Sequence, residues 1–356
     1  DSTKTGSIWR PTAMRRTSAA ALVVMAFLAV SPAFATTYFV RKSGNNANAG
    51  TSPAAAWLTI QKAANTMVAG DTVYVGPGTY VESVNVTISG SAGNPISYIA
   101  DPAGAFTSDV AGPVVIDPSS GNAVNLNAAD WTIIDGFTIV GQGTGNTYGI
   151  RGMNGSNNHT IRNCDISGFG SSNDSDAIRF GQSLNILVEN CALHHNTGHG
   201  YKQVGSGNLN ANVVFRNNSV FANGRQGFEA VYTGGGGNVV VVEKNFIHHQ
   251  GDDGIEFTST NGSAIVRNNV VYRNGAYGIE SSNTSATIVN NTVVRNSATG
   301  LQTESAGTYR VYGNIFYLNA AGVVDQNAGT ILWDYNCYGT TDSLSIAAGP
   351  NDVVAD

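Results

Sequence analysis

Seven positions spaced along the chain carry side chains that could do chemistry. Each ends a short step in which a small and an apolar residue precede it, as in Tyr-Gly-Ile-Arg and Asp-Gly-Ile-Glu. Because the apolar residue of a strand faces the core, the next side chain faces outward. We expect stacked strands to bring these side chains into one exposed column, about 4.8 Å apart. The column consists of Arg151, Arg179, Lys202, Glu229, Glu256, Glu280 and Gln302.

The acidic half of the column predicts a metal site. Stacked glutamates repel one another, because like charges opposite each other destabilise a sheet. A cation would relieve that repulsion, and calcium accepts carboxylate oxygens as ligands. We expect the calcium ligands to be Glu229, Asp252, Asp253 and Glu256.

The basic half predicts a site for acidic groups and for proton transfer. Lys202 is the preferred base for removing a proton from a substrate, and Arg179 is the alternative. The residues expected to contact the substrate are Arg151, His199, Arg225, Tyr277 and Glu280.

Two other interpretations of the column stay open. Glu229 and Glu256, one coil apart, approach the separation of about 5–5.5 Å found in retaining glycoside hydrolases, and Glu229 with Glu280 the wider separation of inverting ones. The column could instead be a solvated sheet face, in which Lys202 and Glu229 form a modest ion pair. Against a solvated face, only 12% of the residues are charged, yet six successive coils carry a charge here.

The composition limits the class of protein. Among 356 residues there are 43 glycines, 18 Lys+Arg and 24 Asp+Glu, which leaves a net charge of -6. A nucleic-acid-binding protein would show a basic surface, so we expect no nucleic-acid partner. Low charge and high glycine content also disfavour a helical bundle.

A repeat of 22 to 28 residues organises the chain from residue 160 onward. Short strands with alternating apolar residues recur in it, and such strands bury a core only when coils stack. We therefore predict an all-β fold, a right-handed parallel β-helix with about eight to ten coils; a β-sandwich would not explain aligned asparagines. One predicted asparagine column is Asn163, Asn190, Asn218, Asn245, Asn269, Asn291 and Asn314. A second is Asn196, Asn223, Gln250, Asn274, Asn296 and Asn319.

The N-terminal part predicts a short capping helix. Residues 57–64 (WLTIQKAA) form an amphipathic stretch that could cover the exposed end of the stack. With the strands around it, the run from residue 37 to 82 resembles the opening module of secreted pectate-lyase-like β-helix proteins. That superfamily includes lyases, hydrolases and epimerases.

The resemblance also touches the column. Calcium-dependent pectate lyases of this type carry an Asp-Asp-Gly-x-Asp run, which Asp252, Asp253 and Glu256 resemble, and a Gly-x-Gly-Phe-Lys step, which the segment ending at Lys202 resembles. In those lyases the lysine follows the metal run, whereas Lys202 precedes it by two coils. The resemblance implies a calcium-assisted lyase that cleaves an acidic, uronic-acid-containing polysaccharide by β-elimination. A glycoside hydrolase and a non-catalytic polysaccharide-binding β-helix remain the alternatives.

The first residues predict export. Met14-Arg15-Arg16, the apolar run of residues 19–30 and an A-x-A site ending at Ala35 form a secretory signal peptide. We expect residues 1–35 to be the extension and signal, residues 36–82 the cap and residues 83–356 the coils of one secreted, monomeric domain without a membrane anchor. Related β-helix proteins continue beyond such a C-terminal segment, which predicts a truncated chain.

Three cysteines are too few for a disulfide framework. Cys164 and Cys191 stand in matching contexts, and we expect a stacked free pair in preference to a disulfide. His194-His195 and His248-His249 end equivalent strands, where packing is favoured over metal binding or proton transfer.

Overall fold

The computed structural model describes residues 2–3, 6, 35–127, 129–143, 145, 147–206, 212–233, 237–259, 262–282, 284–304, 307–326, 330–340 and 342–355. Residues Ala35–Asp356 form one compact unit. The predicted signal segment lies almost entirely outside the described residues.

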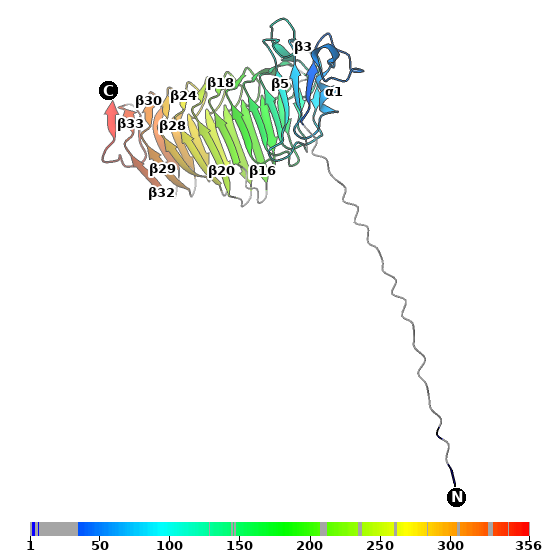
Figure 1. Cartoon of the computed structure of the whole chain (residues 1–356). Helices are drawn as coiled ribbons and strands as arrows, with labels where there is room; N and C mark the ends of the chain where they lie inside the picture. The colour runs from blue at the N-terminus through cyan, green and yellow to red at the C-terminus, as the bar shows by residue number, and fades with distance from the viewer. Residues whose placement is uncertain are drawn as a thin grey trace. The chain divides into compact units, whose positions relative to one another are not determined.

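Three long parallel sheets, here named A, B and C, run along this unit, and the chain visits them in turn (Figure 1). Each strand pairs in parallel with its equivalent one coil away, as β14 does with β11 and β17. The predicted parallel β-helix is confirmed, and the 10 strands of sheet C agree with the expected number of coils.

The strands of the three sheets have the following bounds. Sheet A contains β1 (Thr37–Val40), β2 (Thr72–Val75), β5 (Ile96–Ala100), β8 (Thr132–Asp135), β11 (His159–Arg162), β14 (Ile186–Glu189), β17 (Asn212–Arg216), β20 (Asn238–Glu243), β23 (Gly262–Arg267), β26 (Ser285–Val289), β29 (Thr308–Tyr312) and β32 (Thr330–Asp334). Sheet B contains β3 (Gly78–Tyr80), β6 (Val114–Ile116), β9 (Thr138–Gly143), β12 (Asp165–Phe169), β15 (Ala192–His194), β18 (Ser219–Phe221), β21 (Phe246–His248), β24 (Val270–Tyr272), β27 (Thr292–Val294), β30 (Ile315–Tyr317), β33 (Cys337–Gly339) and β34 (Val353–Ala355). Sheet C contains β4 (Val84–Asn85), β7 (Val124–Asn125), β10 (Ile150–Gly152), β13 (Ile178–Gly181), β16 (Tyr201–Ser206), β19 (Phe228–Thr233), β22 (Ile255–Ser259), β25 (Ile279–Ser282), β28 (Thr299–Glu304) and β31 (Ala321–Gln326).

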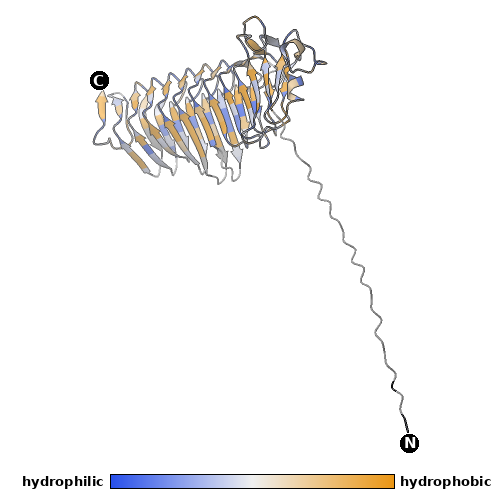
Figure 2. Cartoon of the chain, in the orientation of Figure 1, coloured by the Kyte–Doolittle hydropathy of each residue, from blue (hydrophilic) through white to orange (hydrophobic). Residues whose placement is uncertain are grey.

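Inward-facing apolar side chains of the three sheets fill one core, and apolar residues recur along the strands (Figure 2). In sheet C, aromatic rings stack from coil to coil, with 5.2 Å between the ring centroids of Tyr201 and Phe228. The apolar residue before each column position is fully buried, which fixes the outward direction of its neighbour. These buried residues are Ile150, Ile178, Tyr201, Phe228, Ile255, Ile279 and Leu301.

A buried amide ladder joins the coils between sheets A and B. Each side-chain amide donates to the Oδ1 of the amide one coil further on, over 3.0–3.1 Å. These bonds satisfy polar groups that would otherwise be costly to bury. The ladder consists of Asn218, Asn245, Asn269, Asn291, Asn314 and Asn336.

The expectation that Asn163 and Asn190 belong to this ladder is wrong. Both adopt the left-handed conformation, with φ near 55°, and lie one position earlier in their coils. Cys164 and Cys191 occupy the ladder position there, and the backbone N–H of Cys191 donates to Oδ1 of Asn218 at 2.9 Å. Asparagine is favoured at both positions, because it tolerates the left-handed bend as well as forming amide ladders.

A second amide ladder, between sheets B and C, matches the prediction. It comprises the expected five asparagines and Gln250, and the amide of Asn196 donates to Oδ1 of Asn223 at 2.9 Å. The amide of Asn296 likewise donates to Oδ1 of Asn319 at 2.9 Å. This ladder precedes the column positions from Lys202 to Gln302 and so locks the starts of these strands of sheet C.

The N-terminal helix is shorter than predicted. After the 3-10 turn η1 (Pro53–Ala55), helix α1 spans Ile60–Ala64, with Thr59 as its N-cap. Trp57 instead forms a bridge with Val40 of β1, which delays the helix start. The buried residues of α1 join the core at the N-terminal end of the stack.

The cysteines are free, with Cys164 and Cys191 buried in the core as expected. The histidine pairs pack with aromatic rings, and the ring centroids of His194 and Phe221 lie 4.6 Å apart. In the part of the chain that the structure describes, no helix is both long and apolar enough to cross a membrane.

Candidate functional site

The predicted column is confirmed on the outer face of sheet C. The strand register pairs Arg151 with Arg179, Arg179 with Lys202, and Lys202 with Glu229. It continues from Glu229 through the two other glutamates to Gln302. The column therefore changes sign once, between β16 and β19.

Two column residues are more buried than expected. Glu229 is only 7% exposed, because Lys202 and His199 cover its carboxylate. Gln302 is 1% exposed. The remaining members are half-buried and open to solvent on the outer face of the sheet.

The basic half forms a balanced charge network. Nη1 of Arg179 lies 3.2 Å from Oδ2 of Asp176 and 3.5 Å from Oδ1 of Asp174. The fully buried Asp176 accepts hydrogen bonds from the backbone N–H and Nδ1 of His199, at 2.8 and 2.7 Å. Asp176 thus joins Arg179 to His199 and neutralises part of their charge.

Glu229 closes this network. Its Oε2 lies 2.7 Å from both Nε2 of His199 and Nζ of Lys202. Burial opposes ionisation of Glu229, but these two contacts prevail and lower its pKa to about 2. Burial likewise opposes charge on His199, whereas its hydrogen bonds to Asp176 and Glu229 raise the pKa of the imidazole.

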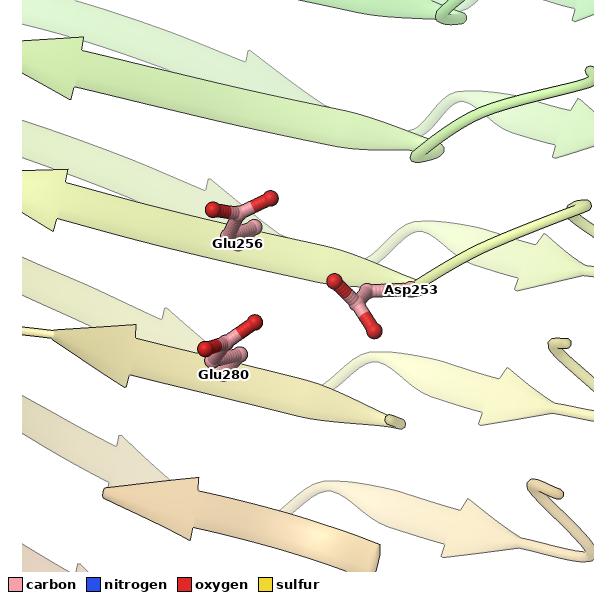
Figure 3. Close-up of side chains that lie close together, drawn as sticks. All are labelled: Asp253, Glu256 and Glu280. Carbon is pink, nitrogen blue, oxygen red and sulfur yellow. The ribbon is translucent and has the colours of Figure 1, made fainter. Parts of the chain in front are cut away.

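The acidic half forms a cluster without a compensating cation among the described residues. Oxygens of Asp253, Glu256 and Glu280 all lie within 4.8 Å of one another. Glu256 and Glu280 project side by side from β22 and β25, and Asp253 precedes β22 (Figure 3). We call these three residues the carboxylate cluster.

Burial and mutual repulsion favour the protonated forms of the cluster. Burial, followed by repulsion from Glu229, raises the pKa of Glu256 to about 7. Burial and the charge of Asp253 raise the pKa of Glu280 to about 8. Burial raises the pKa of Asp253 to about 6. The backbone N–H of Tyr277, which donates to its Oδ1 at 2.8 Å, opposes this rise.

Gln226 connects the network to the carboxylate cluster. Its Nε2 donates to Oε2 of Glu256 at 2.5 Å and reaches oxygens of Asp252 and Asp253 at 3.4 Å. Gln226 is 5% exposed, and its buried Oε1 has no hydrogen-bond partner among the described residues. An amide oxygen of this kind is a suitable ligand for calcium.

The other predicted site residues lie around this centre. The guanidinium groups of Arg151 and Arg179 lie over the ring of Tyr148, at 5.7 and 5.4 Å from its centroid. Arg225 stands beside Gln226, and its Nε is buried without a partner among the described residues. Tyr277 precedes β25, where its backbone holds Asp253.

Sequence reasoning missed Asp176 and Gln226 as members of the site. Neither residue is among the site residues expected from the sequence. Both belong to the set of residues three positions before the column, together with Tyr148, His199, Asp253 and Tyr277. That spacing was the available signal, because a residue at a strand start lies beside the outward side chain three positions later.

The carboxylate cluster fits a hard divalent cation. Its donors are all oxygen atoms, the ligands that calcium prefers, and their mutual repulsion would be relieved by positive charge. Asp253, Glu256 and Glu280 would hold the ion, with Asp252 and Gln226 at the edge. Glu229 faces the basic network instead, since it is paired with Lys202 and His199.

A second row of charged residues, on sheet A, shows that this fold does not require basic and acidic residues to be separated along a sheet. On sheet A the charges alternate from strand to strand, and three ion pairs join them at 2.6–2.8 Å. The alternating residues are Asp135, Arg162, Glu189, Arg216, Glu243 and Arg267. The column on sheet C is therefore a local departure from charge balance.

Several solved structures share the fold at low sequence identity. Pectate lyase Pel9A is 19% identical, with 89% of this chain and 78% of that chain covered and a TM-score of 0.56. The alginate lyase from Paenibacillus sp. str. FPU-7 is 18% identical, with 77% of this chain and 96% of that chain covered and a TM-score of 0.57. The GH136 lacto-N-biosidase from Eubacterium ramulus is 12% identical, with 85% of this chain and 68% of that chain covered and a TM-score of 0.54.

No curated protein sequence matches the chain. A family model described as Pel9A-like, right handed beta helix region, matches residues 38–336, which is most of the chain. The chain belongs to the Pel9A-like family of right-handed β-helices.

Proposed function

We propose that the protein is a secreted, calcium-assisted polysaccharide lyase that cleaves a uronic-acid-containing chain by β-elimination. The observation that carries this proposal is the carboxylate cluster, whose Glu256 and Glu280 lie in the same column as the three basic residues. Membership of the Pel9A-like family and the names of two lyases among the solved structures support the same reaction.

The basic half of the column would bind the acidic substrate. Arg151 has no ion pair among the residues described, so its guanidinium is available to a uronate carboxylate. Arg225, whose Nε has no partner among the described residues, would extend the contact surface toward the acidic half, together with Tyr277. His199 is fully buried and would act on Lys202 and Glu229 instead of on the substrate.

Calcium held by Asp253, Glu256 and Glu280 would neutralise a uronate carboxylate and so make the adjacent C5 proton easier to remove. Gln226 holds Glu256 and Asp253 in place by hydrogen bonds. These residues would hold the substrate carboxylate in the same column as the base, which lies two strands from Glu256.

Lys202 is the proposed base, and Arg179 is the alternative. Nζ of Lys202 would accept the C5 proton, after which the C4–O4 bond breaks and the double bond forms between C4 and C5. The departing O4 would take a proton from solvent. Because Nζ lies 2.7 Å from Oε2 of Glu229, the bound substrate has to draw Lys202 from this ion pair. The proton of Lys202 must pass to solvent before the reaction, because the contacts of Glu229 lower its pKa to about 2 and those of His199 raise the pKa of the imidazole.

The test is a screen of polyuronates for unsaturated products. We expect ultraviolet absorbance from the new double bond on at least one substrate, its loss with a chelator, and a reduction of at least about 100-fold for Lys202→Ala. Glu280→Gln should lower activity at limiting calcium, while Glu189→Gln on sheet A serves as the matched control. Activity that survives both the chelator and Lys202→Ala would refute the proposal.

A glycoside hydrolase is the second candidate, favoured by one observation. Glu229 and Glu256 are paired on adjacent strands, and their environments move their pKa values apart, to about 2 and about 7. A carboxylate beside a carboxylic acid is the arrangement that hydrolases use. Release of reducing ends without ultraviolet absorbance, abolished by Glu256→Gln, would establish this candidate in place of the lyase; retention of polysaccharide with neither product would indicate a binding role.

A further inference from the structure

Sheet A carries a groove on its outer face, apart from the column on sheet C. Its volume is about 520 Å³, within the usual range of ligand sites, about 300–1,000 Å³. Gly93 and Pro95 form one side, next to the half-buried Trp131, and the groove continues over β11, β14 and β17. None of the column residues lines it.

The floor of the groove is mainly apolar. Ile133, Leu187 and Val214 face outward, with Thr160 between the first two, and the strand register aligns all four side by side. All four are half-buried, so apolar surface remains in contact with solvent. Trp131 lies at one end of this floor and adds an aromatic ring.

An amide ladder forms the rim. Nδ2 of Asn185 donates to Oδ1 of Asn158 at 2.8 Å, and Nδ2 of Asn212 donates to Oδ1 of Asn185 at 3.0 Å. Each amide can donate two hydrogen bonds and accept two, so donor and acceptor capacity remains on every coil. The amides repeat about every 4.8 Å along the stack, beside the apolar floor.

The groove is electrically neutral. Among the described residues that line it there is no Asp, Glu, Lys or Arg, and burial lowers the pKa of the lining His159 to about 4, so its imidazole is neutral. The nearest charges on the same strands, Asp135 with Arg162 and Glu189 with Arg216, neutralise each other in ion pairs. A polyuronate would find no counter-charge here, in contrast to the column on sheet C.

We propose that this groove is a binding site for an uncharged oligosaccharide, separate from the acidic-substrate site. A sugar chain has apolar ring faces and hydroxyl edges, which suit the aromatic and aliphatic floor and the amide rim respectively. The absence of charge selects a neutral chain. A peptide cannot add as a strand, because the strands of sheet A already pair on both sides.

The test uses linear neutral hexasaccharides of xylose, glucose, mannose and galactose, so it does not depend on lyase activity. Titration should change the Trp131 emission saturably with at least one of them, because Trp57 is buried in the core and Trp333 is 8% exposed. The fourth tryptophan, Trp9, stands in the predicted signal segment. In calorimetry, Trp131→Ala should weaken that binding at least about tenfold.

Asn185→Gly is the second variant, since it removes the central amide, keeps Trp131 as the reporter and tolerates the left-handed backbone at this position, φ 56°. We expect it to weaken binding about threefold or more. The column variant Lys202→Ala should leave binding unchanged. The proposal is overturned if no neutral hexasaccharide binds, if only oligouronates change the emission, or if Trp131→Ala binds as well as the wild type.

Discussion

At the scale of single residues, Glu229 separates the two halves of the column. It is buried and accepts contacts from His199 and Lys202 at 2.7 Å, so its negative charge belongs to the basic network. The carboxylate cluster that follows is left with three acidic groups and no cation among the described residues. This division gives the site one balanced half and one half that attracts positive charge.

Glu229→Gln should therefore destabilise the protein strongly. Removing one partner of a buried ion pair leaves the other charge uncompensated and costs about 3–5 kcal/mol. Chemical denaturation should show this loss in the free energy of unfolding. Glu189→Gln breaks a more exposed pair with Arg216, whose side chain is 40% exposed, and should cost below about 1 kcal/mol; equal losses for the two variants would contradict the assignment.

The carboxylate cluster predicts a pH dependence of stability. Burial and repulsion raise the folded-state pKa of Glu256 to about 7 and of Glu280 to about 8, above the ordinary value of 4.5. Their contribution to stability is thus fully present below about pH 4.5 and is lost as the pH rises through those values. Without calcium, we expect Tm to fall between about pH 5 and pH 8.

Thermal unfolding at several pH values measures this effect. Calcium at about 100 times its Kd should add about 2.7 kcal/mol and reduce the fall at the alkaline end. Glu280→Gln should flatten the metal-free profile, because it removes one of the repelling charges. A profile that neither calcium nor Glu280→Gln alters would rule out the proposed metal site.

The sequence predicted the residues of the column and the pairing of Lys202 with Glu229, but not the other partners. The register followed from the short step that precedes each column residue, which is a local pattern. The pairing of Glu229 with His199 depends on side-chain direction across two coils, and Asp176 and Gln226 gain their roles only from that packing. Spacing alone does not specify such contacts.

At the scale of elements, the two amide ladders connect neighbouring coils. Oδ1 of Asn269 accepts hydrogen bonds from the backbone and side chain of Asn245, while its Nδ2 donates to the oxygens of Val242 and Asn291. Substitution of this side chain would leave several buried polar groups without partners. The ladders thus contribute to stability at every turn between sheets A, B and C.

Asn269→Ala should lower the free energy of unfolding by at least about 3 kcal/mol, because each buried polar group left without a partner costs about 1–3 kcal/mol. Asn268→Gly is the matched control, because Asn268 is exposed and adopts φ 58°, which glycine tolerates. Its cost should stay within about 0.5 kcal/mol. Urea unfolding of both variants provides the comparison, and a similar loss for both would show that the ladder contributes little.

The repeat predicted the fold because it combined two periodicities, alternating residues within strands and aligned amides between coils. It failed at Asn163 and Asn190, where the same residue type serves the left-handed bend. The amphipathic pattern of residues 57–64 placed the helix start too early, because Trp57 forms a bridge with Val40. In both cases the residue type is compatible with two local structures: asparagine with the amide ladder or the left-handed bend, and tryptophan with a helix or a strand.

At the scale of the whole molecule, each coil contacts mainly its neighbours, so local stabilisation should stay local. We expect calcium to slow amide hydrogen exchange in β22 and β25 and, more weakly, in β19 and β28. The N-terminal strands β1, β2 and β5 should exchange as before. Protection that spreads evenly over all coils, or that is absent from β22 and β25, would contradict the placement of the metal.

From Lys202 to Asn319, the coils differ in length only in the turn between sheets C and A. The second ladder precedes the column by six residues in every pair, as in Asn196 and Lys202 or Asn274 and Glu280, and the two ladders are always five residues apart, as in Asn218 and Asn223. From Glu229 to the next ladder residue, Asn245, there are 16 residues, but from Glu280 to Asn291 only 11. Insertions between sheets C and A can therefore reshape the surroundings of the column without moving it, which makes that turn the natural place to graft loops for a new specificity.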